Sequence, residues 1–115
     1  MPDALQRVCF VMHLQPERVD DYLAAHEHVW PEMLDALRDA GWRNYSLFLR
    51  PDDGMVVGYL ETEDFDRATA AMEQTAVNDR WQAQMAQYFR PATPGSDGAN
   101  PDTIRHQLRE YFHLS

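Results

Sequence analysis

The chain has 115 residues, enough for one domain, and its 19 acidic against 10 basic residues give a net charge of −9. This charge excludes the basic stripe with which proteins bind nucleic acid, and it disfavours anionic membrane surfaces and strongly anionic substrates. No residue is lysine, which excludes Schiff-base chemistry and a P-loop, and the lone cysteine permits neither an internal disulfide nor a cysteine-based zinc site.

The first expected elements are a strand and a long helix. Residues 7–14 form a short run whose two alternating faces are both largely apolar, which indicates a covered strand. Pro16 suits the first turn of a helix, helical apolar periodicity follows, and Gly41 is the expected stop. Pro31 cannot donate a backbone hydrogen bond and disfavours helical geometry at Trp30, so the helix should kink or restart there.

A hairpin and two helical stretches follow. Residues 42–49 and 55–61 are expected strands, joined by a Pro-Asp-Asp-Gly turn. Asp64 can cap a helix that runs to about Gln74, and a second helical stretch covers residues 77–88.

The carboxyl-terminal part has two expected features. The prolines and glycines of residues 90–103 predict a long irregular loop, which in a compact domain is usually a lid, a crossing arm or disorder. Residues 108–114 are the expected last strand. At the other end, the first residues lack the apolar run of a signal peptide and no stretch reaches membrane-spanning length, so we expect a cytoplasmic protein.

The order β-α-β-β-α-α-β is typical of a ferredoxin-like α+β fold, with one antiparallel sheet and its helices on one face. We expect a single domain over residues 1–115. A sheet of this kind normally leaves its other face wet, yet these strands are apolar on both faces. A second copy packed sheet to sheet is the simplest cover, so the pattern predicts a homodimer with isologous symmetry.

Candidate site residues begin with Tyr22, His26 and Trp30, whose spacing of four places large side chains with polar groups on one helix face. Tyr45 joins the same crevice if its strand face is the helix side, and Trp81 can wall it from the later helix. Aromatic faces stack on the C–H surface of a sugar, while phenols and imidazoles bond its hydroxyls. A single histidine acid–base contributes about 10²- to 10⁴-fold in rate, which suits an easy reaction such as acetal opening and reclosing.

Each of these residues taken alone has a plainer explanation. A histidine, tyrosine or tryptophan on an apolar face is more often a packed core residue, and it is their convergence that favours a site. His13 is more often a satisfied structural group, and it becomes a pocket residue only if its strand face points into the crevice. His26 and His28 do not form a metal pair, because residues two apart on a helix diverge, so we expect no metal site.

These residues resemble the L-rhamnose mutarotase family, in the same order and at similar spacing over almost the whole chain. The resemblance implies a dimeric α/β barrel of ferredoxin-like subunits, which interconverts the α and β anomers of L-rhamnose, a small neutral monosaccharide, without a cofactor. The matching pieces are Tyr22, His26, Trp30-Pro31-Glu32, Gly41, Asn44-Tyr45, Arg80-Trp81 and Phe112-His113-Leu114.

The resemblance also implies roles for individual residues. His26 would match the family's proton donor, and Tyr22 and Tyr45 would match its sugar-contacting tyrosines. Trp81 would match the first residue of an aromatic pair on the late helix. Gln82 departs from that pair and offers an amide where an indole face is usual, which leaves L-fucose or another 6-deoxy sugar open as the substrate.

The implied mechanism has one open assignment. Protonated His26 would donate to the ring oxygen while a base, either His26 itself through water or Tyr22, removes the anomeric hydroxyl proton. Tyr22 and Tyr45 would orient hydroxyls and Trp81 would stack, with Trp30 as a further candidate for the pocket. Two alternatives belong to other classes: a cofactor-free monooxygenase on the same dimeric barrel, and a non-catalytic sugar-binding dimer.

Overall fold

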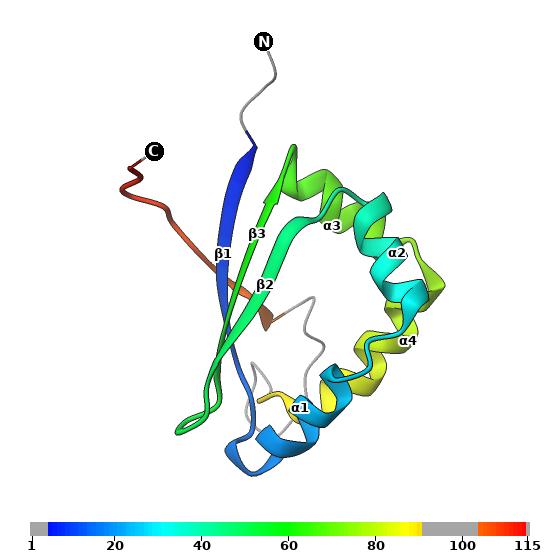
Figure 1. The fold of residues 1–115 in the computed structure, drawn as a ribbon, viewed down its shortest axis with the longest axis vertical. Coiled ribbons are helices and arrows are strands. Elements are labelled where there is room, and N and C mark those ends of the chain that lie inside the picture. Colours follow the sequence, from blue (N-terminus) through cyan, green and yellow to red (C-terminus); the bar gives the residue numbers. More distant parts are fainter. Residues whose placement is uncertain (1–4, 91–103, 115) are drawn as a thin grey trace.

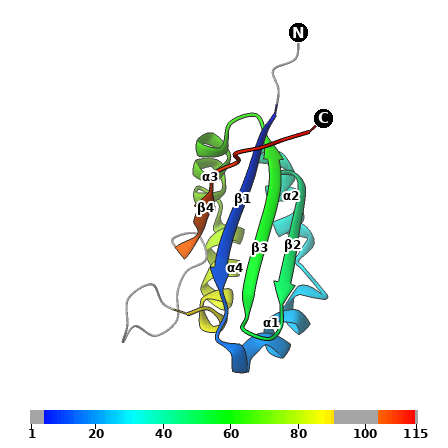
Figure 2. The ribbon, with the colours of Figure 1, turned by 90° about the vertical axis from the view of Figure 1, so that its left-hand side faces the viewer.

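The computed structural model describes residues 5–90 and 104–114. Its strands form one antiparallel sheet in the order β2-β3-β1-β4: β1 (Gln6–His13), β2 (Arg43–Arg50), β3 (Met55–Thr62) and β4 (His106–Leu108). The helices are α1 (Val19–His26), α2 (Pro31–Asp39), α3 (Phe65–Glu73) and α4 (Ala76–Met85), with short 3₁₀ turns η1 (Pro16–Arg18) and η2 (Ala86–Tyr88). The α-helices lie together on one face of the sheet (Figures 1 and 2). This arrangement confirms the expected ferredoxin-like α+β fold.

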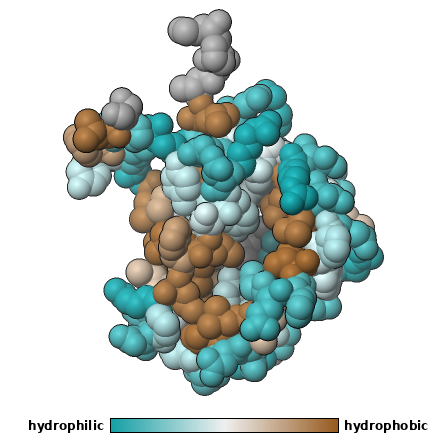
Figure 3. All heavy atoms as spheres, viewed as in Figure 1, coloured by the Kyte–Doolittle hydropathy of each residue, from teal (hydrophilic) through white to brown (hydrophobic). Residues whose placement is uncertain are grey.

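The inner face of the sheet carries the core. Alternate side chains of β1 and β3 point toward the helices and are buried, as the period of two in a strand requires. The set comprises Val8, Phe10, Met12, Val56 and Leu60. In Figure 3, hydrophobic residues gather over the sheet and over the helices that face it, on the two sides of a hollow.

The outer face of the sheet also carries apolar side chains, as the sequence predicts. Cys9, Val11 and Val57 point to this side and are only partly buried, and Phe48 on β2 is 62% exposed. Within the described chain, the α-helices cover only the opposite face (Figure 2). The outer face therefore carries an apolar patch of Val11, Val57 and Phe48 beside a polar cluster that includes Tyr59 and Glu61, and a second protein surface could bury the patch.

The helix restart at Pro31 is confirmed, and it changes the position of Trp30. α1 ends at His26, Trp30 has an extended backbone with φ −58° and ψ 133°, and Pro31 occupies the first turn of α2. Trp30 thus lies outside the helix that carries Tyr22 and His26. The expected stripe of three aromatic residues on one helix is wrong, because the proline excludes helical geometry one residue before the third of them.

Two further predicted boundaries are the start of α3 and the position of the last strand. Asp64 caps α3 as expected, since its Oδ1 accepts a hydrogen bond of 3.0 Å from the backbone N–H of Arg67. The last strand is much shorter than expected: β4 ends at Leu108, and residues 109–114 are not a strand. A side-chain ion pair, from Arg7 Nε to Glu110 Oε2 at 2.7 Å, joins β1 to this segment in place of further ladder hydrogen bonds. The expected irregular loop, apart from Arg90, lies outside the described residues.

Candidate active site

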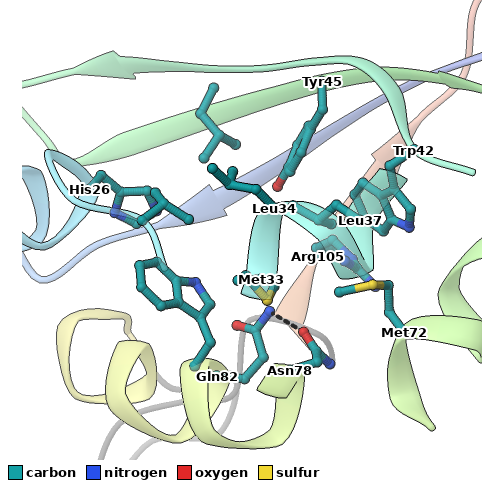
Figure 4. A pocket seen from close by; sticks show the side chains of 13 residues that line it. His26, Met33, Leu34, Leu37, Trp42, Tyr45, Met72, Asn78, Gln82 and Arg105 are labelled. Atoms are coloured by element: carbon teal, nitrogen blue, oxygen red, sulfur yellow. Dashed lines mark hydrogen bonds between the residues drawn. The ribbon is translucent and has the colours of Figure 1, made fainter. Parts of the chain in front are cut away.

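A cavity of about 210 Å³ lies between the inner face of the sheet and the helices (Figure 4). Apolar side chains make up most of its wall, including Met33, Leu34 and Leu37 from α2. A smaller cavity of about 40 Å³ adjoins it, shares several lining residues with it and is also lined by Tyr22. Among the described residues, the polar groups on the wall of the larger cavity are His26, Tyr45, Asn78, Gln82 and Arg105, together with the indoles of Trp42 and Trp81. A small apolar site with a few polar groups is the usual form of a small-molecule pocket.

His26 closes α1 and is oriented by its own helix. Its Nδ1 lies 3.1 Å from the backbone oxygen of Tyr22, one turn earlier. A carbonyl oxygen can only accept, so in this bond Nδ1 carries the hydrogen and donates it, which leaves Nε2 as the nitrogen for a ligand. The rings of Tyr22 and His26 lie 4.3 Å apart between centroids.

Burial moves the pKa values of these two groups in opposite directions. Desolvation lowers the pKa of His26 below that of an ordinary histidine, because the charged form loses water, and the hydrogen bond to the Tyr22 carbonyl opposes this only in part. Desolvation, together with the nearby Tyr45 phenol, raises the pKa of Tyr22 well above its usual range. At neutral pH His26 is therefore a neutral imidazole, and Tyr22 is a protonated phenol that makes a poor base.

Trp81 stands between His26 and Trp30. Its ring lies edge-on to His26 at 5.4 Å and edge-on to Trp30 at 5.1 Å. The structure therefore brings Tyr22, His26, Tyr45 and Trp81 together around the two adjoining cavities. Trp30 packs against Trp81 and is not among the described residues that line either cavity.

His13 is the predicted pocket candidate that the structure does not bring in. It lies at the end of β1, on the outer side of the sheet, and is exposed. The strand's alternation sends its buried neighbour Met12 to the inner face instead. His13 contributes its backbone oxygen, which accepts a hydrogen bond of 2.8 Å from the N–H of Arg90.

Gln82 lines the cavity with its amide held in place. Its Nε2 donates to Oδ1 of Asn78, one turn earlier on α4, at 3.0 Å (Figure 4). Asn78 is only 2% exposed, so this pair forms a fixed polar floor in an otherwise apolar wall. The amide occupies the place next to Trp81 where the family resemblance implies a second aromatic ring.

Two polar lining residues, Asn78 and Arg105, were not predicted from the sequence. Asn78 is one turn before Gln82, a spacing that could have suggested their pairing. Arg105 precedes a strand of three residues, and only the pairing of that strand with β1 brings it to the cavity. Among the residues that the structure describes, no group of three His, Cys, Asp or Glu side chains could hold a metal ion. None of the described helices is long and apolar enough to cross a membrane.

The sequence comparisons identify the family. The L-rhamnose mutarotase family model matches residues 7–114. The chain belongs to the L-rhamnose mutarotase family. It is 34% identical over 110 residues to an L-rhamnose mutarotase from Acidiphilium cryptum, covering 96% of this chain and 99% of that protein. It is 32% identical over 110 residues to the L-rhamnose mutarotase of Bacillus subtilis, at the same coverage. As a member of this family, the chain is an isomerase that acts on carbohydrate anomers.

Solved structures agree on the fold. An L-rhamnose mutarotase from Formosa agariphila matches with a TM-score of 0.75 at 21% identity, over 96% of this chain and 99% of that one. A putative antibiotic biosynthesis monooxygenase from Nitrosomonas europaea matches with a TM-score of 0.59 at 16% identity, over 94% and 89% of the two chains. At such identities the likeness shows the fold alone, so the monooxygenase alternative gains only a shared scaffold while the family model supports the mutarotase.

Proposed function

We propose that this protein interconverts the α and β anomers of L-rhamnose as a cytoplasmic homodimer, with His26 as its acid and base. The observation that carries the proposal is the orientation of His26: one ring nitrogen is held by the Tyr22 carbonyl, and the ring lines the cavity. The apolar wall of Met33 and Leu34 suits the methyl group of a 6-deoxy sugar.

Neutral His26 acts first as a base. Its Nε2 takes the proton of the anomeric hydroxyl, the bond from C1 to the ring oxygen breaks as the C1 carbonyl forms, and the imidazolium returns the proton to the departing oxygen. The open aldehyde rotates about the bond between C1 and C2, and the same steps in reverse close the ring on its other face. One histidine thus serves both directions, and protons and electrons balance without a cofactor.

The other site residues bind and orient the sugar. Tyr22, kept protonated by burial, offers a hydrogen bond, and so does Tyr45 from β2. Trp81 presents an indole to the C–H surface of the sugar ring. The edge-on contact with Trp30 fixes the orientation of this indole. Gln82, fixed by Asn78, bonds a hydroxyl where a second aromatic ring would only stack.

The outer face of the sheet supports the dimer. Val11, Val57 and Phe48 give it an apolar surface, and a second copy related by a two-fold axis would bury the same residues on both sides. Tyr111 and Phe112, in the segment after β4, are also exposed and add apolar surface for a partner.

Anomer-exchange NMR with L-rhamnose tests the activity. The wild-type protein is expected to raise the exchange rate well above the rate in buffer, and to act more weakly on L-fucose. Calorimetric binding of L-rhamnose with exchange at the buffer rate would contradict the proposal and indicate a non-catalytic sugar-binding dimer. Sedimentation at assay concentration measures the oligomeric state independently.

The pH profile tests which form of His26 acts. Burial lowers the pKa of His26, and the neutral form is the active one, so kcat/KM should stay level as the pH falls past about 6.5, the ordinary histidine value. It should decline only at lower pH, as the folded enzyme's imidazole becomes protonated. Exchange rates corrected for the uncatalysed reaction between about pH 4.5 and 8 give the midpoint. A rate that rises on acidification would show that the protonated form starts the reaction.

A further inference from the structure

We propose that Arg105 determines which sugars this site accepts, by binding two adjacent hydroxyl groups on the side of the pyranose ring away from the anomeric carbon. The inference rests on the proposed function, because His26 then fixes which side of the sugar reacts. It defines the substrate class as aldopyranoses with free hydroxyls at both C3 and C4.

The pairing of β4 brings Arg105 to the cavity. In the residues that follow it, His106 pairs with Val11 and Gln107 pairs with Phe10. The Arg105 guanidinium carbon lies over three aromatic rings, at 5.5 Å from the centroid of Phe10, 5.8 Å from Trp42 and 5.9 Å from Phe65. Arg105 is half-buried, and cation–π attraction to several rings holds the group at this place.

The rings around Arg105 are themselves fixed. Phe10 is buried on the inner face of the sheet, and Trp42 is buried where β2 begins. The indole Nε1 of Trp42 donates a hydrogen bond of 3.3 Å to the backbone oxygen of Ala68 in α3. The guanidinium therefore rests on a rigid aromatic base, which is the condition for a binding group that discriminates between ligands.

Arg105 and His26 both line the two adjoining cavities, and each lies against a different set of aromatic rings. The rings next to His26 belong to Tyr22 and Trp81, and neither of them is among the rings under Arg105. Tyr45 links the two sets of rings: its ring is 4.9 Å from that of Trp42, and its phenol acts on the pKa of Tyr22. Figure 4 shows the Tyr45 hydroxyl pointing into the space between His26 and Arg105.

The chemistry of the guanidinium selects the ligand groups. Among the described residues that line the cavity, Arg105 is the one with a permanent charge, and none is a carboxylate. A guanidinium has five N–H donors in a planar fork and no acceptor, and with aromatic rings against its faces it binds ligands through its edge. Two oxygens side by side match such a fork. The net charge of −9 disfavours a carboxylate, so adjacent hydroxyls are the favoured pair.

The shape of a pyranose then identifies the hydroxyls. With C1 and the ring oxygen at His26, the bond on the opposite side of the ring is the one between C3 and C4. The hydroxyls on these two carbons therefore point toward Arg105. A sugar that lacks either one loses half of the fork contact, and one that carries a bulky group there does not fit.

The test combines one enzyme substitution with one substrate change. With L-rhamnose, Arg105→Ala should lower kcat/KM about 10- to 100-fold, mostly through KM, which is the usual effect of losing hydrogen bonds from a charged donor. With 4-deoxy-L-rhamnose, the wild type should already be impaired, and Arg105→Ala should lower kcat/KM much less than it does with L-rhamnose. Arg105→Lys keeps the charge but loses the fork, so it should recover only a small part of the loss.

The controls separate binding from structure. Arg38→Ala removes the same charge from an exposed site on α2, where Arg38 pairs only with Asp35 in the described structure, and should leave both sugars unaffected. Equal losses on the two sugars in Arg105→Ala, or no loss with L-rhamnose, would overturn the inference while the proposed function stands. If Arg105→Ala does not fold, Arg105→Lys gives the same comparison. A wild type that accelerates neither sugar would overturn the proposed function, and this inference with it.

Discussion

Replacement of His26 by alanine is expected to lower the catalysed rate of anomer exchange by about 10²- to 10⁴-fold, the usual contribution of a single acid–base group. The imidazole lines the cavity, its Nδ1 is engaged by the Tyr22 carbonyl 3.1 Å away, and its Nε2 remains for the sugar. Tyr22 cannot replace it as a base, because burial raises the pKa of its phenol well above the usual range. Exchange NMR with L-rhamnose at saturating and subsaturating concentrations gives kcat and KM separately.

Two further variants separate proton transfer from structure in this prediction. His28→Ala removes an exposed histidine two residues away and should leave the exchange rate unchanged. His26→Gln introduces an amide that can donate a hydrogen bond to the Tyr22 carbonyl but cannot accept and release a proton at neutral pH. It should bind L-rhamnose and still exchange it as slowly as the alanine variant. A His26→Ala enzyme within about threefold of the wild type would contradict the acid–base role, since even the low end of the usual contribution is far larger.

Local patterns in the sequence predicted the parts of the site that lie within one element. Tyr22 and His26 share a helix, so their spacing alone places them one above the other. The cap at Asp64 and the restart at Pro31 likewise depend on interactions within a few residues. Trp30 was misplaced because its spacing of four from His26 was interpreted as helical, although Pro31 disfavours helical geometry at Trp30.

Local patterns could not predict the parts of the site that depend on the pairing of strands far apart in the sequence. Arg105 enters the cavity because β4 pairs with β1, a contact between segments almost a whole chain apart. β4 itself was predicted in the wrong place, since the apolar residues after Leu108 favour a strand but here lie exposed, with an ion pair from Arg7 to Glu110. Alternation showed that both faces of the sheet are apolar, yet it could not say which face carries the helices.

Replacement of Gly58 by alanine is expected to destabilise the fold by about 1–3 kcal/mol, the usual cost of overpacking a core. Gly58 on β3 lies opposite Phe10 on β1, and the Phe10 ring crosses the space where a side chain would stand. An added Cβ would lie 2.5 Å from Cε2 and 2.7 Å from Cε1 of that ring, far inside van der Waals contact. The ring is 1% exposed and carries the Arg105 guanidinium on it, so it cannot turn away freely. Urea unfolding measures the loss, and the exchange assay should show a raised KM.

A double substitution tests whether the ring is the cause. Phe10→Leu shortens the side chain opposite Gly58 and carries its own cost for the cavity it leaves. In that background Gly58→Ala should cost well under half of what it costs in the wild type, because the added methyl group then fills vacated space. Contacting residues are expected to couple in this way, whereas independent sites add. Additive losses would mean that the alanine acts through the β3 backbone. The KM of the double variant should stay raised even where its stability recovers, because the Phe10 ring under the Arg105 guanidinium is missing.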